Sequence, residues 1–143
     1  YRIRRSIVCK NIICINMITD KIQQIIDYAY PKIQSYYGKG SLDFPKIELH
    51  KDIYARLSGD EEQSGEHSRS TKAQYDEDTN VIYIYYPNMK TEEDILRSII
   101  HEYTHYRQDH KLFKQYRQLY SYDENPIEIE AHKNEEDWQL FTN

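Results

Sequence analysis

The sequence predicts an α+β fold in which helices accompany a short, mostly antiparallel, twisted sheet. Apolar residues recur every three or four positions in two stretches, 18–37 and 91–110, which is typical of helices with one buried face. Residues 46–50 alternate as a half-buried strand does, and residues 73–86 carry a hairpin signal. A chain of 143 residues can bury one modest core, so we expect a single domain over residues 1–143.

The composition is that of a globular chain. Charged residues make up 30% of the sequence and hydrophobic residues 38%, which separates it from disordered proteins. The net charge of −5 argues against a partner that is held through phosphate contacts. We therefore expect no nucleic-acid partner.

The first residues, 1–17, combine three arginines with an interrupted apolar run. This run is too short and too polar to span a bilayer, and no small-residue cleavage site follows it. Cys9 and Cys14 are too few for a disulfide framework, so we interpret them as reduced packing residues. These features predict a cytoplasmic protein without a membrane partner, in which residues 1–17 form a peripheral lead-in.

The first helix is expected over residues 18–37, with Thr19 or Asp20 as its cap and Pro31 as a residue that ends or kinks it. Its expected buried side consists of Ile18, Ile22, Ile25, Ile26, Ala29 and Ile33. A turn-rich connection then leads to the predicted strand at 46–50.

The hairpin signal consists of two β-rich runs, Ala73 to Tyr75 and Val81 to Tyr86, on either side of a polar turn. Pro87 and Asn88 are expected to stop the second strand. An exposed edge of such a sheet can add an extended peptide as a further strand through main-chain hydrogen bonds.

The second helix begins at Thr91, a good N-cap with Asp94 three residues later. Inside this helix lies the motif H-E-x-x-H, formed by His101, Glu102 and His105. Residues four apart share a helix face, so both imidazoles can converge on one ion with the Glu102 carboxylate beside them. Two imidazoles at this spacing suit zinc, whereas the alternative is that both histidines lie on a solvated face.

A catalytic zinc site needs a third protein ligand and an open position for water. The metzincin arrangement is excluded, because Gln108 and Lys111 stand where its glycine and third histidine would be. Residues 111–122 continue with a helical pattern, and residues 127–141 form a last helix with Trp138, Leu140 and Phe141 as expected core anchors.

The last helix is introduced by Asn125 as cap and Pro126 in its first turn. Glu128 lies 23 residues after His105, which leaves room for the chain to reverse and bring this carboxylate back to the two histidines. In a second interpretation, Glu128 is a capping-box residue that reaches back to Asn125.

The pairing of His101-Glu102-x-x-His105 with Glu128-x-x-Ala131 resembles the gluzincins, in particular the minigluzincins and the ImmA-type peptidases of phages and mobile elements. The resemblance implies a small zincin-like domain whose C-terminal helix carries the third ligand. It maps that role onto Glu128, and it implies one Zn²⁺ per chain. His132 departs from the Asp or Asn that often follows the alanine, so Glu130 and His132 are rival third ligands.

The resulting expectation is a zinc metalloendopeptidase that acts on peptide or protein substrates. Glu102 would be the general base for a zinc-activated water. A further donor to the oxyanion is expected from one of four residues: Tyr116, Tyr120, Tyr122 or His132. Two alternatives remain open: a catalytically inactive zinc-binding regulatory or interaction module, and a metal-free helical interaction domain.

Overall fold

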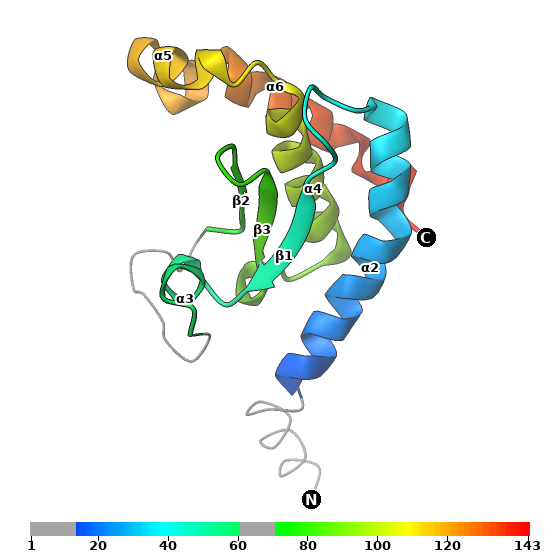
Figure 1. The fold of residues 1–143 in the computed structure, drawn as a ribbon. Helices are drawn as coiled ribbons and strands as arrows, with labels where there is room; N and C mark the ends of the chain where they lie inside the picture. Colours follow the sequence, from blue (N-terminus) through cyan, green and yellow to red (C-terminus); the bar gives the residue numbers. More distant parts are fainter. Residues whose placement is uncertain (1–13, 61–70) are drawn as a thin grey trace, which may run out of the picture.

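The computed structural model describes residues 14–60 and 71–143, which form a mixed α+β fold (Figure 1). The α+β class agrees with the sequence prediction. Along the chain the elements are α2 (Cys14–Tyr37), β1 (Lys46–His50), α3 (Ile53–Ser58), β2 (Ala73–Asp76), β3 (Val81–Tyr85), η3 (Tyr86–Asn88), α4 (Glu92–Arg107), α5 (Lys111–Leu119), η4 (Tyr122–Glu124), α6 (Pro126–Glu135) and η5 (Glu136–Phe141).

The sheet has the strand order β1-β3-β2, with β3 in the centre. Strands β2 and β3 form the predicted antiparallel hairpin, in which Ala73 lies opposite Ile84. Strand β1 pairs with β3 in parallel, with Lys46 opposite Val81, so the expectation of a mostly antiparallel sheet was wrong. The reason is that the chain crosses over between β1 and β2, and local sequence patterns do not report the pairing that follows such a crossover.

Helix α2 begins at Cys14, so the expected cap at Thr19 or Asp20 was wrong, and the end of the predicted lead-in belongs to this helix. Residues 1–13 lie outside the described part of the chain, and with them most of that lead-in. Pro31 lies inside α2 and does not end it. The helix ends at Tyr37, where Gly38 adopts the left-handed conformation that glycine tolerates best.

The core lies between α2, α4 and one face of the sheet. From α2 it receives Ile22, Ile26, Ala29 and Ile33, whereas Ile18 is exposed. Ile82 and Ile84 of β3 face this core, while Val81, Tyr83 and Tyr85 pack on the opposite face beside α3. At the C-terminal end Phe141 is buried, Trp138 is partly buried, and Leu140 is 60% exposed and therefore not the predicted anchor.

Tyrosines fix the connection between α2 and β1. From α4, Tyr103 donates to the Gly38 carbonyl and Tyr106 to the Leu42 carbonyl, each at 2.5 Å. Tyr30 of α2 donates to the carbonyl of Pro45 at 2.6 Å. These bonds satisfy carbonyl groups of a segment that has no regular structure of its own.

Helix α4 lies across the sheet and is bounded by local signals (Figure 1). The Thr91 hydroxyl accepts the backbone N–H of Asp94 at 3.1 Å, which confirms the predicted cap. The helix stops at Arg107, and α5 begins only at Lys111 and ends at Leu119, before the predicted end at Tyr122. The predicted last helix is split into α6 and the 3₁₀ helix η5.

Among the described residues, no helix combines the length and the apolar character needed to cross a bilayer.

Thr91→Ala should lower the free energy of unfolding by about 1 kcal/mol, because the N–H group of Asp94 loses its acceptor. Thr91→Ser keeps the hydroxyl and should remain close to the parent. Urea unfolding monitored by circular dichroism compares the three proteins. An equal loss in both variants would contradict a capping role.

Candidate metal centre

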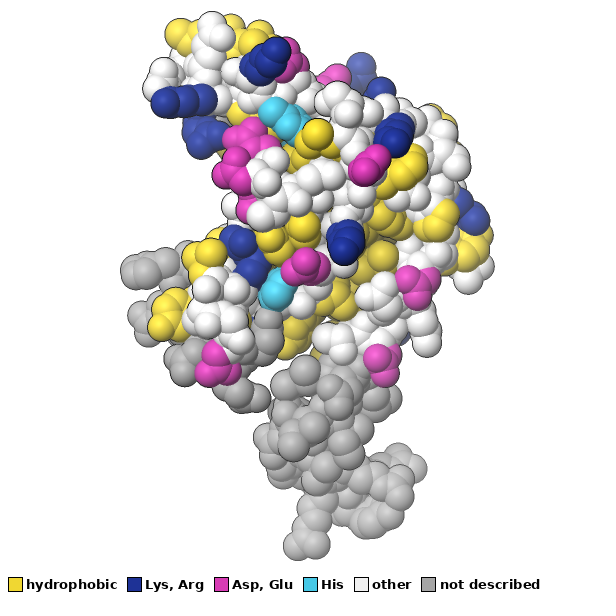
Figure 2. All heavy atoms as spheres, viewed as in Figure 1, with side chains coloured by type: hydrophobic (Ala, Val, Ile, Leu, Met, Phe, Trp, Pro, Cys, Tyr) yellow, Lys and Arg dark blue, Asp and Glu magenta, His cyan; other side chains and the backbone are white. Residues whose placement is uncertain are grey.

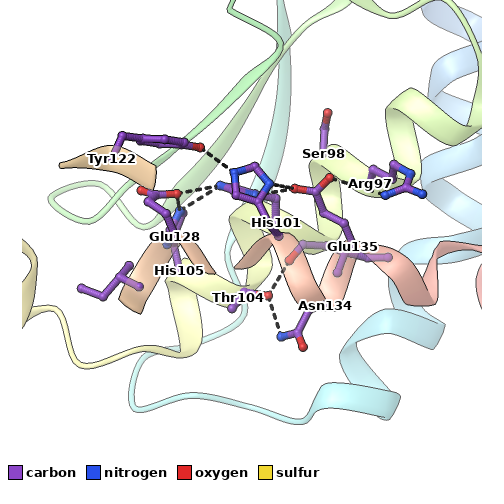
Figure 3. A network of polar contacts seen from close by, with 12 residues as sticks. Arg97, Ser98, His101, Thr104, His105, Tyr122, Glu128, Asn134 and Glu135 are labelled. Carbon is purple, nitrogen blue, oxygen red and sulfur yellow. Dashed lines mark hydrogen bonds and ion pairs between the residues drawn. The ribbon is translucent and has the colours of Figure 1, made fainter. Parts of the chain in front are cut away.

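Two helices bring four side chains of the sequence prediction together. Helix α4 presents His101, Glu102 and His105, and α6 packs against α4 and presents Glu128 (Figure 3). Ala131, one turn beyond Glu128, is fully buried. Because Ala131 lies three residues after Glu128, it is on the same side of α6.

Three ligand-type atoms converge on one point. The Nε2 atoms of His101 and His105 lie 3.1 Å apart. Glu128 Oε1 lies 3.0 Å from the first of these nitrogens and 3.1 Å from the second. A triangle of two imidazole nitrogens and a carboxylate oxygen at this spacing is compatible with a metal ion.

The outer nitrogen of each imidazole has an acceptor. His101 Nδ1 lies 2.7 Å from Glu135 Oε2, and His105 Nδ1 lies 2.7 Å from Gln108 Oε1. Since carboxylate and amide oxygens accept hydrogen bonds, both Nδ1 atoms donate. In the neutral form both Nε2 atoms therefore carry lone pairs that point toward Glu128, an arrangement that favours a cation between them.

Glu135 and Gln108 are themselves held in place. Glu135 lies 2.8 Å from His132 Nδ1 and 3.9 Å from the guanidinium of Arg97 (Figure 3). The Gln108 amide donates to the Ile127 carbonyl at 3.0 Å and to Glu130 at 2.7 Å. The orientation of both imidazoles is thus fixed from α6 and from the residue that follows α4.

Neither rival third ligand of the sequence analysis belongs to this triangle, although the ring of His132 lies edge-on to that of His101, with their centroids 4.7 Å apart. Glu130 accepts from Gln108, and His132 lies between Glu135 and the Tyr122 hydroxyl, which is 2.9 Å from its Nε2. Glu128 does not form a capping box, because its carboxylate faces the histidines while the Asn125 side chain accepts the Ile127 N–H at 3.0 Å. Two further groups have ligand-type atoms within 4.8 Å of one another: His101 with Glu102 and His105, and His101 with His132 and Glu135.

The charges of the cluster are strongly coupled. Burial disfavours a charged His101, but hydrogen bonds to Glu128 and Glu135 outweigh burial and raise its pKa to about 10. Burial opposes the charge on Glu128 as well, yet the two imidazoles hold the pKa of this carboxyl well below its usual range.

Glu102 differs from Glu128 in its surroundings. It is 6% exposed, and burial raises its pKa. The backbone N–H of Tyr75 lies near its carboxylate and partly offsets this effect, so the side chain faces the edge strand β2.

A cleft in two halves opens at the cluster. One half, a cavity of about 440 Å³, is lined by Lys72, Arg97 and Glu135 among others. The other half, of similar volume, lies between β2 and α5. Both halves share five residues: Ala73, Glu102, His105, Tyr122 and Glu128.

Of the four expected oxyanion donors, the fold places Tyr122 and His132 together at the cleft and the other two farther from the histidines. Tyr122 lines both halves of the cleft, and burial, with the charges of Glu128 and Glu102, raises its pKa to about 12, so its hydroxyl keeps its proton. Tyr120 lines one half only, and Tyr116 lines a different cavity. His132 contacts Tyr122.

Sequence reasoning missed Glu135 and used Gln108 only to exclude the metzincins. A signal for Glu135 existed, since it lies seven residues after Glu128 and so on the same face of α6. Nothing in the local sequence of Gln108 indicates its contacts, because they depend on how α4 ends.

Comparison of the chain with protein-family models, curated proteins and solved structures found no match.

The raised pKa of His101 has a consequence for chelator-treated protein. Its ordinary value is 6.5, so the stabilisation from the paired imidazolium should be complete below about pH 6.5 and be lost as the pH rises through about 10. Glu135→Gln removes one of its two carboxylate partners. The excess stability of the parent over this variant should therefore be largest near pH 6.5 and shrink toward pH 10, as measured by urea unfolding. A difference that stays constant over this range would contradict the pairing.

Proposed function

We propose that this protein is a zinc-dependent peptidase of the gluzincin type, in which His101, His105 and Glu128 hold Zn²⁺ and Glu102 is the general base. The observation that carries the proposal is the convergence of two Nε2 atoms and one carboxylate oxygen at 3.0–3.1 Å from one another. The resemblance of the two motifs supports it independently.

The donor set suits zinc in number, chemistry and spacing. Zinc binds imidazole nitrogen and carboxylate oxygen at about 2.0–2.2 Å, which places tetrahedral ligand atoms about 3.3 Å apart. Small shifts would bring the three atoms to that separation. Acceptors on both Nδ1 atoms are the supports that zinc-binding histidines require. Because the triangle borders the cleft, a fourth position remains for water or substrate.

When bound, zinc would supply a Lewis acid that polarises the scissile carbonyl and lowers the pKa of a water to about 7. The Glu102 carboxylate would take the proton of the attacking water and deliver it to the leaving amine. Its burial suits this role, because a raised pKa makes the carboxylate a better proton acceptor. The Tyr122 hydroxyl, with its proton retained, would donate a hydrogen bond to the oxyanion.

Strand β2 offers a place for the substrate backbone. The Tyr85 N–H donates to the Lys72 carbonyl at 2.9 Å, so this pair uses its main-chain groups within the sheet. By the alternation of antiparallel pairing, the main-chain groups of Ala73 and Tyr75 point to the outer edge. The Tyr75 N–H lies near the Glu102 carboxylate, and the main-chain groups of Ala73 would pair with an extended peptide in the cleft.

Zinc content tests the metal site. Protein purified without added metal and then supplied with zinc should hold about one zinc per chain by elemental analysis. Glu128→Ala should lose most of it, whereas Glu124→Ala, a matched change at an exposed position just before the same helix, should keep it. A folded parent without zinc would end the proposal, and zinc retained by Glu128→Ala would move the third ligand to another residue.

Glu102→Gln tests catalysis separately from metal binding. The variant should keep its zinc but lose peptide hydrolysis by a factor of at least 10²–10⁴, the usual contribution of a general base. Glu92→Gln, on the exposed start of the same helix, should leave the rate unchanged. The readout is release of new amino groups from unstructured casein. Zinc binding with no hydrolysis by the parent would instead favour a non-catalytic zinc module.

A further inference from the structure

The half of the cleft between β2 and α5 has walls of different chemistry. Strand β2 contributes one wall, and Phe113 and Arg117 of α5 contribute the other. The ring of Phe113 packs edge-on against His105, with their centroids 5.9 Å apart. This wall therefore contacts one of the candidate metal ligands directly. Tyr120 adds a second aromatic ring, which is itself in an edge contact with Tyr116.

Arg117 is the single Lys or Arg among the described residues that line this half. Within residues 14–60 and 71–143 its side chain forms no ion pair or hydrogen bond. The other half of the cleft differs, because Lys72 pairs with Asp94 at 3.2 Å and Arg97 pairs with Glu93 at 2.8 Å. In Figure 2, Lys and Arg side chains lie along α5, and Asp and Glu side chains lie next to them at the upper rim of the hollow on the left edge of the molecule.

The carboxylates in this half do not neutralise Arg117. Glu128 is engaged by both histidines, and Glu102 lies buried against β2. In the proposed zinc-bound protein these two carboxylates balance the two positive charges of Zn²⁺. Among the side chains that line this half, the Arg117 guanidinium is then the one charge that no other lining residue balances.

We infer that this half of the cleft selects a carboxylate of the peptide substrate, with Arg117 as the recognising group. The inference rests on the proposed function and names the substrate class of the same site. A guanidinium binds a carboxylate through two parallel hydrogen bonds, which gives direction as well as charge. The carboxylate comes from an Asp or Glu side chain near the scissile bond or from the C terminus of the peptide, and the two sources are separable by experiment.

The experiment compares the zinc-loaded parent with Arg117→Gln, Arg117→Glu and Lys114→Glu. Lys114 is exposed on the same helix and lines no part of the cleft, so Lys114→Glu repeats the charge reversal at a position without the proposed contact. Cleavage of a peptide mixture of random sequence, mapped by mass spectrometry, locates the position at which acidic residues are enriched. Quenched fluorescent peptides that carry Glu, Gln or Lys there, each with a free or an amidated C terminus, then give kcat/KM ratios.

The parent should prefer the carboxylate peptide by roughly 10- to 100-fold, the usual value of a hydrogen-bonded charge. Arg117→Gln should bring this ratio close to one, Arg117→Glu should favour the Lys peptide, and Lys114→Glu should keep the parental ratio. A preference that follows Glu identifies a side chain, and one that disappears on amidation identifies the C terminus. Hydrolysis without a carboxylate preference, or a preference that survives Arg117→Gln, overturns the inference and leaves the proposed peptidase standing.

Binding separates the two proposals when no hydrolysis is found. Fluorescence polarisation measures the affinity of the same peptides for the Glu102→Gln protein with and without the Arg117 substitutions. Binding that depends on Arg117 and on the carboxylate supports the pocket while the peptidase proposal fails. Absence of both hydrolysis and carboxylate-dependent binding overturns both.

Discussion

Burial of an ionisable turn of α4 is the constraint on which the arrangement of this protein depends. His105 and Glu102 lie almost completely inside, and His101 lies largely inside. A buried charge is costly unless it has a partner of opposite charge or a hydrogen bond. The partners come from α6, from the end of α4 and from strand β2, and within the described residues no buried side-chain nitrogen or oxygen is left without one. The reversal of the chain after α4 therefore brings partners to the polar residues of this turn as well as apolar side chains to the core.

Elements defined by local chemistry could be predicted from the sequence. The cap at Thr91, the cap at Asn125 and the hairpin around residues 76–80 all depend on residues within a few positions of one another. The errors concern features that depend on distant contacts. The parallel pairing of β1 follows from a crossover, and the exposure of Leu140 follows from how η5 meets the rest of the chain. The short helix α3 was not expected, although Asp52 caps it and Gly59 ends it.

In the candidate site, too, the sequence predicted what depends on local spacing and not what depends on distant contacts. The motif placed His101, Glu102 and His105 on one helix, and the spacing of Glu128 allowed it to return to them. Which of three rival residues would face the histidines depended on the rotation of α6 about its axis, and only the packed structure fixes that rotation. The contacts of Gln108 could not be predicted, because they depend on how α4 ends. The spacing of Glu135 from Glu128 indicated its face of α6, but the contact with His101 depends on how the two helices pack.

The methyl group of Ala131 has a consequence for ion size. Ala131 is fully buried on the side of α6 that carries Glu128 and Glu135, and α6 packs on α4, so the size of this residue bears on the separation of the two helices. In the proposed enzyme this separation sets the distance between Glu128 and the two imidazoles. Zinc needs ligand distances of about 2.0–2.2 Å, whereas calcium needs about 2.3–2.6 Å and more oxygen ligands. A small residue at this position thus keeps the distance between Glu128 and the imidazoles short enough for a small cation. A bulkier side chain would increase that distance.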